Sequence, residues 1–574
     1  MTSFVRSNPL LLPRLTGKTI FYGLALTLLL LMLWIQKDFG VTWDEWMQGH
    51  YGKLVLRYFL SGGVNHDFLT FAQTMYLYGG LFDTLTGFFY GILSGDLRHF
   101  AYSGLHDTLE GISRQDIAGS GYFEIRHFVN AVFGFLAIFY AGLTAQKLRS
   151  WRAACLTLLF LALSPQFLAH CMNNPKDIPF AAMTTMALNY MLLFFQEFPA
   201  PRKKTLVLLA VSIAGALNIR IGGLMLIFQL GVFSVITASW AFLKHEKIDL
   251  LKLAKYIITL SLASYFGGLI FWPYGQLDPI HNPLSAFAQM SKFVGATSQL
   301  LFQGHRVLSS NLPWYYIPLW VGIANPLFFH TGLFLCGLFG SLLQKKIDPR
   351  LLAMTLFAAL FPIAFVVLRG SILYDGWRHF LFVYPPLVIL AAIGWDIFIS
   401  FSENKIIRII LSLLLIAHLA QPLIWMIRNH PNENVYFNSL AGGLKGAHGN
   451  YETDYWGNSA RDCAEWLGKY HLQNYPEKKI TVATTAFFMS TYPYLKKALG
   501  DLYTPQILFA QEVRQLPPPD YFIASSRKMT REQILGGAWP PEGTLYEAKA
   551  DGVTLCAVVA VTNVRSSAPS ETLR

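Results

Sequence analysis

Long apolar segments recur along the first three quarters of this 574-residue chain. A helix needs roughly 17 to 25 apolar residues to span the hydrocarbon core of a bilayer. Only 14% of the residues are charged, whereas soluble domains carry about 25%. The sequence therefore predicts a polytopic α-helical membrane protein with about eleven transmembrane helices, expected at 19–36, 123–145, 153–170, 180–197, 204–218, 221–243, 256–273, 314–343, 351–368, 380–400 and 406–427.

The basic residues sort to one side of these expected helices. The net charge is +12, and the short gaps that carry Lys and Arg are 147–152, 201–204, 244–255, 344–350 and 405–408. The positive-inside rule places such gaps in the cytoplasm. An odd number of crossings from a cytoplasmic N-terminus satisfies the rule and puts the C-terminal tail outside. We therefore attribute the basic charge to cytoplasmic loops and not to nucleic-acid binding.

The opposite face is expected to carry the long, aromatic loops, including a large first outer loop at 37–122. We divide the chain into a transmembrane domain, 1–428, and an extracytoplasmic soluble α/β domain, 429–574. The second contains β-branched, strand-like segments at 478–488, 520–527 and 544–562 and one segment of helical spacing, 459–472. Two of the five cysteines, Cys463 and Cys556, fall in this domain, where they either pair or stay free.

The segment GVTWDEWMQGHYG, residues 40–52, follows the first apolar run and carries Asp44 and Glu45 among tryptophans. One interpretation is that Thr42 and Asp44 only cap a following helix. The other is catalytic, because a carboxylate in a partly dry cleft can accept a proton from an attacking hydroxyl or amine.

The second outer motif is HCMNNPKDIPFAAM, residues 170–183. A capped turn would explain Asp177 and Pro179, although it leaves several other polar residues unexplained. A carboxylate and an imidazole could also hold a divalent cation, which makes Asp177 and His170 the candidate metal ligands.

Basic residues at outer helix ends form a third group. Arginine forks match phosphate oxygens in a bidentate manner, although arginine near a helix end often only snorkels to the interface. The candidate phosphate-binding residues are Arg378, His379, Arg220 and Lys176. The segment 433–459 is rich in Gly, Tyr and Trp, as in sugar-binding loops and membrane-surface belts alike. No Walker loop, HExxH or GxSxG motif occurs, so we expect no nucleotide cofactor.

The acidic segments TWDE (42–45) and NNPKD (173–177) resemble those of the GT-C superfamily of polytopic glycosyltransferases. Protein O-mannosyltransferases and bacterial lipid A aminoarabinose transferases are the most similar members by pattern. The segments YDGWRHFLFVYPP (374–386) and YFNSLAGGLKGA (436–447) are also similar to those of uncharacterised bacterial members. The resemblance covers the whole architecture, except for the inserted β-trefoil domain of the protein O-mannosyltransferases.

The resemblance implies that Asp44 is the catalytic base, with Glu45 as its neighbour. It further implies that Asp177 orients the acceptor or a divalent ion, and that the donor is a polyprenyl-phosphate sugar. We therefore expect an inverting glycosyltransferase that moves a hexose or pentose to a lipid, glycan or protein acceptor on the outer face of a bacterial inner membrane. The alternatives are a lipid or glycan transporter, which would place ionisable residues at mid-span, and a non-catalytic scaffold.

Overall fold

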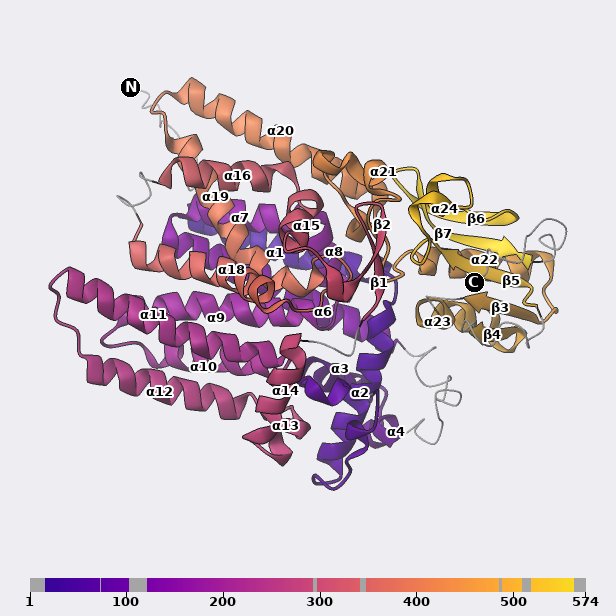
Figure 1. Ribbon diagram of the computed structural model, residues 1–574, viewed down its shortest axis with the longest axis horizontal. Helices are drawn as coiled ribbons and strands as arrows, with labels where there is room; N and C mark the ends of the chain where they lie inside the picture. The colour runs from indigo at the N-terminus through magenta and orange to yellow at the C-terminus, as the bar shows by residue number, and fades with distance from the viewer. Residues whose placement is uncertain are drawn as a thin grey trace, which may run out of the picture.

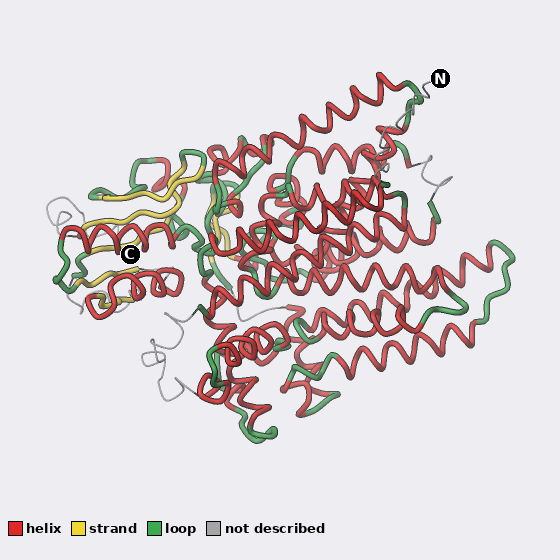
Figure 2. The backbone as a smooth tube through the Cα atoms, turned by 180° about the vertical axis from the view of Figure 1, so that it is seen from behind, coloured by secondary structure: helices red, strands yellow, loops and turns green. Residues whose placement is uncertain are grey.

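The computed structural model describes residues 16–72, 74–102, 121–292, 297–340, 347–484, 488–507 and 518–561. Within this part the chain is mostly helical, and its long helices lie side by side in a bundle, with a small sheet at one end (Figure 1). Figure 2 shows the same separation from behind, with the strands confined to the sheet and to a short hairpin between the sheet and the bundle.

Seven helices in the described residues are long and apolar enough to cross a membrane. They are α1 with η1 (Gly17–Asp38), α6 (Tyr122–Leu148), α9 (Asp177–Glu197), η4 with α11 (Ile221–Leu243), α18 (Pro349–Arg369), η6 with α19 (Arg378–Ser400) and α20 (Lys405–Asn429). Burial is highest in α9 and α19, which form the centre, and lowest in α20, on the outside.

Two further expected helices are broken by proline. The pair α7 (Trp151–Ala162) and α8 (Pro165–Asn173) bends by 72°, and the pair α15 (Tyr316–Ala324) and α16 (Leu327–Leu338) bends by 115°. Proline cannot donate a backbone hydrogen bond and disfavours a helical conformation in the residue before it. Ser164 and Asn325 accordingly leave the helical region, with ψ of 99° and 148°.

By this criterion of length and apolar composition, the described residues hold fewer spans than the eleven or so that the sequence predicts. Counting each bent pair once gives up to nine spans in the described residues. Helices do form at the other two expected positions, as α10 (Lys203–Leu217) and α12 (Leu250–Gly267). However, α10 has only 15 residues, and α12 carries two lysines, Lys252 and Lys255, within its 18 residues.

The expected outer loop 37–122 is largely helical where it is described. It forms α2 (Trp43–Leu60), α3 (Leu81–Leu93), α4 (Leu97–Tyr102) and two short 3-10 turns, η2 (Asp67–Leu69) and η3 (Met75–Leu77). The expected loop 274–313 forms α13 (Pro273–Leu277), α14 (His281–Lys292), the antiparallel hairpin of β1 (Gln299–Phe302) and β2 (His305–Leu308), and η5 (Ser309–Asn311). These elements lie at the end of the bundle that carries the sheet (Figure 1).

The C-terminal sheet has five strands in the order β4-β3-β5-β7-β6. They are β3 (Ile480–Thr484), β4 (Tyr503–Ile507), β5 (Tyr521–Ser525), β6 (Thr544–Ala550) and β7 (Val553–Ala560). The first three are parallel and β7 is antiparallel to its neighbours. Helices α22 (Ala460–Asn474) and α23 (Phe488–Leu499) share a hydrophobic core with these strands, so the expected small α/β domain is confirmed. Strand β4 was not predicted.

The segment between the last span and α22 packs with the bundle. It contains η7 (Glu433–Val435), η8 (Ser439–Ala441) and α21 (Gly443–Ala447), and Val435, Phe437 and Leu444 are buried in the main core. We therefore propose that the compact C-terminal domain begins near Ala460 and not at 429. Its two cysteines, Cys463 and Cys556, are hydrogen-bonded neighbours in the domain core and both are free thiols.

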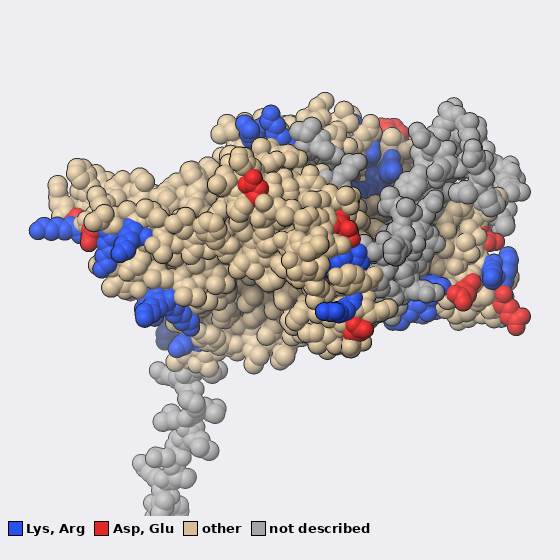
Figure 3. All heavy atoms as spheres, turned by 90° about the horizontal axis from the view of Figure 1, so that it is seen from below, with Lys and Arg blue, Asp and Glu red and all other residues tan. Residues whose placement is uncertain are grey.

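Charged residues mark the two ends of the bundle. In Figure 3, Lys and Arg gather at the end away from the sheet, and a broad area with few charges follows before the sheet end. The exposed basic residues at the far end include Arg202, Lys203 and Lys204 at the start of α10, and Lys244 and Lys247 after α11. This distribution suits a chain whose bundle lies in a bilayer.

Candidate active site

The first turn of α2 separates the roles of the two adjacent carboxylates. Thr42 is the N-cap, and the Glu45 side chain completes a capping box by accepting from the Thr42 backbone N–H at 2.7 Å. Glu45 is 1% exposed and also lies 3.1 Å from Nε2 of His127. Capping therefore involves Thr42 and Glu45, whereas Asp44 points elsewhere, with 28% of its side chain exposed.

Asp44 faces the guanidinium of Arg378, which begins the 3-10 turn η6 (Arg378–Val383) before α19. Its Oδ2 lies 3.8 Å from Arg378 Nη2. Arg378 is 3% exposed, and it also donates to Asp375 at 3.1 Å and to Asp177 at 3.2 Å. Trp456 covers one side of the guanidinium, 4.8 Å from its Cζ. One arginine thus joins three segments that are far apart in the sequence.

Asp177 occupies the first position of α9 and is buried. Asn174 fixes it in place, because the Asn174 side chain donates to the carboxylate at 2.9 Å and accepts from the Asp177 backbone N–H at 2.9 Å. The carboxylate also forms ion pairs with Arg220 and Arg378. A buried carboxylate needs such compensation, because its desolvation is costly.

Lys176 is the next cation of the site. Its Nζ lies 3.8 Å from the centre of the Tyr78 ring, and no carboxylate of the described residues lies within 4 Å of it. Burial lowers its pKa to about 8, although the carboxylate of Asp44 opposes that shift. His379 packs edge-on against Tyr374 at 4.8 Å, beside Arg378.

We name the group of Asp44, Asp177, Asp375, Arg220, Arg378 and Lys176 the arginine–carboxylate cluster. It contains five of the residues that were predicted for the site, and His379 flanks it. Glu45 was predicted beside the catalytic base, but its carboxylate is turned into the helix cap and towards His127.

The two predicted metal ligands do not fit a divalent cation. His170 contacts Tyr455 Oη through Nε2 at 2.8 Å and Asn174 through Nδ1 at 3.2 Å. The carboxylate of Asp177 is already paired with two guanidinium groups, which would repel a cation. Within the described ranges, no three His, Cys, Asp or Glu side chains gather as a metal-ligand group.

Asp375 and Arg527 belong to the site but were not predicted. Asp375 has a φ of 55° and precedes Gly376, with a φ of 65°, so this Asp-Gly pair forms the tight turn that aims Asp375 at Arg378. The DG dipeptide is a recognised turn signal and could have identified it. Arg527, which donates to Asp375 at 2.6 Å, follows strand β5 without any sequence signal.

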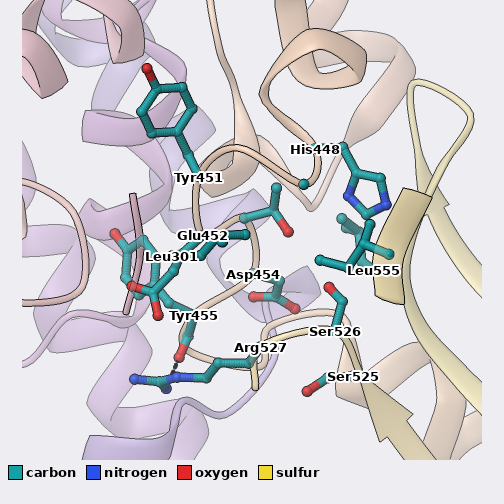
Figure 4. A pocket seen from close by; sticks show the side chains of 13 residues that line it. Leu301, His448, Tyr451, Glu452, Asp454, Tyr455, Ser525, Ser526, Arg527 and Leu555 are labelled. Atoms are coloured by element: carbon teal, nitrogen blue, oxygen red, sulfur yellow. Dashed lines mark hydrogen bonds between the residues drawn. The ribbon is translucent and has the colours of Figure 1, made fainter. Parts of the chain in front are cut away.

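A small pocket adjoins the cluster where Arg527 reaches across from the C-terminal domain (Figure 4). Arg527 also donates to the backbone carbonyl of Tyr455. Glu452 lines the same pocket and is buried, and burial raises its pKa to about 7 although Arg527 opposes the shift. The pocket therefore places a titratable carboxylate near Arg527, which itself pairs with Asp375.

Residues 115–265 match the family model described as dolichyl-phosphate-mannose-protein mannosyltransferase. The matched segment runs from α6 into α12 and includes Lys176, Asp177 and Arg220. The match supports the GT-C glycosyltransferase class that the acidic loops predict.

No curated protein matches the chain by sequence. Among solved structures, the chain is similar to ArnT from Cupriavidus metallidurans bound to undecaprenyl phosphate. That match has 15% identity and a TM-score of 0.41, and it covers 96% of this chain and 99% of ArnT. It is also similar to the oligosaccharyltransferase AglB from Archaeoglobus fulgidus, in complex with an inhibitory peptide and a dolichol-phosphate. That match has 13% identity and a TM-score of 0.45, and it covers 84% of this chain and 64% of AglB.

Proposed function

We propose that this protein transfers a sugar from a polyprenyl-phosphate donor to an acceptor at the membrane surface, with Asp44 as the catalytic base. The observation that carries the proposal is the position of Asp44. Its side chain is partly exposed and takes no part in the helix cap, yet it lies 3.8 Å from a buried arginine. The cluster therefore offers one accessible carboxylate beside fixed positive charge.

The basic residues of the cluster suit the phosphate of the donor. Arg378 and Arg220 are held by buried carboxylates, so their positions are fixed before a ligand arrives. Lys176 lies within 4 Å of no described carboxylate and would supply charge to a phosphate. Fixed charges aimed at the developing charge of a leaving group are among the largest contributions to catalysis.

The proposed reaction is a single displacement. The acceptor hydroxyl or amine attacks the anomeric carbon while Asp44 accepts its proton. The bond between that carbon and the phosphate oxygen breaks, and the oxygen leaves as polyprenyl phosphate, whose negative charge Arg378, Arg220 and Lys176 stabilise. The configuration at the anomeric carbon inverts. We further propose that the site faces the periplasm of a bacterial inner membrane and that the acceptor is a lipid, a glycan or a protein.

Replacement of Asp44 by Asn tests this proposal, because Asn keeps the size of the side chain and removes the base. The purified protein is incubated with undecaprenyl-phosphate-linked pentoses and hexoses, and release of undecaprenyl phosphate is measured. The variant should lose about 10²- to 10⁴-fold in turnover while its melting temperature stays within a few degrees of the unsubstituted protein.

The matched control is Asp67→Asn, in the same region of the chain but on the surface, where Asp67 pairs with Arg57. It should keep full turnover. Equal activity of Asp44→Asn and the control would refute the role of Asp44. Movement of a lipid across vesicles that is unaffected by Asp44→Asn would favour the transporter.

A further inference from the structure

A groove of about 930 Å³ lies between the C-terminal end of α20 and the turn that joins β6 to β7. The wall on α20 is mostly apolar, with Ala417, Ala420, Ile424 and Trp425, and it also includes Gln421. In Figure 1 these elements meet where the bundle joins the C-terminal domain. None of the residues that line the groove belongs to the arginine–carboxylate cluster.

The groove is basic at the C-terminal end of α20 and across from that helix. Arg428, Lys445 and Lys549 line it together with one carboxylate, Asp551, which leaves an excess of positive charge. Lys549 pairs with Glu547 at 3.1 Å. Arg428 and Lys445 are exposed, and neither has a carboxylate of the described residues within 4 Å. These two cations are therefore available to bind an anion from outside the chain.

The walls of the groove are fixed by contacts within the protein. The Asp551 backbone N–H donates to the side chain of Asn429 at 2.5 Å, which holds the β6–β7 turn against α20. Asp551 and Gly552 have φ of 46° and 78°, as a tight two-residue hairpin turn requires. Trp425 packs edge-on against Tyr436 at 5.0 Å.

The apolar wall continues along the outside of the bundle. Helix α20 is a candidate membrane span, and only 17% of its apolar stretch is buried within the protein. Ile424 and Ile427 on this helix are 47% and 71% exposed. Acyl chains would cover this surface in a bilayer. The groove thus combines an apolar wall along α20 with positive charges near the C-terminal end of this span, where a lipid headgroup would lie.

We propose that this groove binds an anionic phospholipid. Its phosphate would lie among Arg428, Lys445 and Lys549, and its acyl chains would lie along the apolar face of α20. Because Lys549 belongs to the C-terminal domain and Arg428 to the last span, one lipid would join the domain to the membrane surface. This lipid site is separate from the proposed donor site and does not depend on the proposed function.

The test uses the full-length protein in detergent and native mass spectrometry with three probes: phosphatidylglycerol, phosphatidylcholine and inorganic phosphate. The test variant carries Arg428→Gln, Lys445→Gln and Lys549→Gln. The matched control carries Lys469→Gln, Lys479→Gln and Lys497→Gln, which remove the same charge from exposed positions of the C-terminal domain outside the groove.

We expect the unsubstituted protein and the control to retain phosphatidylglycerol in preference to phosphatidylcholine, and the test variant to bind phosphatidylglycerol about tenfold more weakly or worse. Equal affinity in the test variant and the control would overturn the proposal. Binding of inorganic phosphate as tight as that of phosphatidylglycerol would also overturn it, because the groove would then be a simple anion site.

Discussion

Arg378 donates a hydrogen bond to Asp177 at 3.2 Å across 201 residues of sequence. This pair ties the start of α19 to the start of α9, the two most buried spans. The charge of Asp177 is shared with Arg220, and that of Arg378 with Asp375 and Asp44. Asp44 is the most exposed carboxylate of this set, with 28% of its side chain accessible, and it is held by one long contact, so it is the carboxylate that a substrate could reach.

Replacement of Arg378 by Gln should destabilise the protein as well as inactivate it. The variant leaves Asp177 and Asp375 with fewer compensating charges in a buried site, and removing one partner of a buried pair costs about 3–5 kcal/mol. The measurement is the melting temperature in detergent together with transfer activity. Arg369→Gln, at the exposed end of α18, is the control and should change neither quantity. An unchanged melting temperature of Arg378→Gln would contradict the central position of this arginine.

Replacement of Glu45 should separate capping from catalysis. Gln can complete the same capping box, so Glu45→Gln should keep turnover within a fewfold and most of the stability. Glu45→Ala removes the box and should destabilise the protein by about 0.5–2 kcal/mol. Thermal unfolding and transfer assays check both variants. A loss of turnover in Glu45→Gln as large as in Asp44→Asn would show that Glu45 takes part in the reaction.

The pH dependence of transfer should carry the signature of Lys176. Burial lowers the pKa of this ammonium to about 8, so its positive charge is lost as the pH rises through 8. We therefore expect kcat/KM to fall as the pH rises above about 8, which gives the pH profile a descending limb there. Lys176→Arg should move the fall to higher pH, because arginine stays protonated, and Lys176→Gln should remove the limb and lower the rate at pH 7. A limb at pH 8 that persists in Lys176→Gln would assign it to another group.

Glu452 should make stability depend on pH. Burial raises its pKa to about 7 from the ordinary value of 4.5, so the folded protein binds the proton more tightly than the unfolded chain does. The contribution of Glu452 to the free energy of unfolding is therefore fully present below pH 4.5 and is lost as the pH rises to about 7. Glu452→Gln should flatten the melting temperature between pH 5 and 8, and Glu465→Gln, at a partly exposed position of α22, serves as the control. An identical pH profile in Glu452→Gln would exclude this carboxylate as the source.

Much of the site could be predicted because its residues lie in sequence next to apolar spans or within a motif rich in aromatic residues. Asp44 follows directly after an apolar span, and Asp177 lies in a short polar segment between two more. Arg378 precedes a span within a motif rich in aromatic residues. The roles within the site were harder to assign, because Asp44 and Glu45 are adjacent and chemically alike. Only the helix geometry showed that Glu45 turns back to Thr42 while Asp44 turns towards Arg378.

The sequence by itself determined that the chain is a helical membrane protein with a small α/β domain at its C-terminus, because apolar length and β-branched content are local properties. Tertiary structure alone decided that Arg527, from the C-terminal domain, reaches Asp375. It also decided that Asp177 is paired with two guanidinium groups. Pairings between distant residues depend on how helices pack, and packing is set by the whole chain.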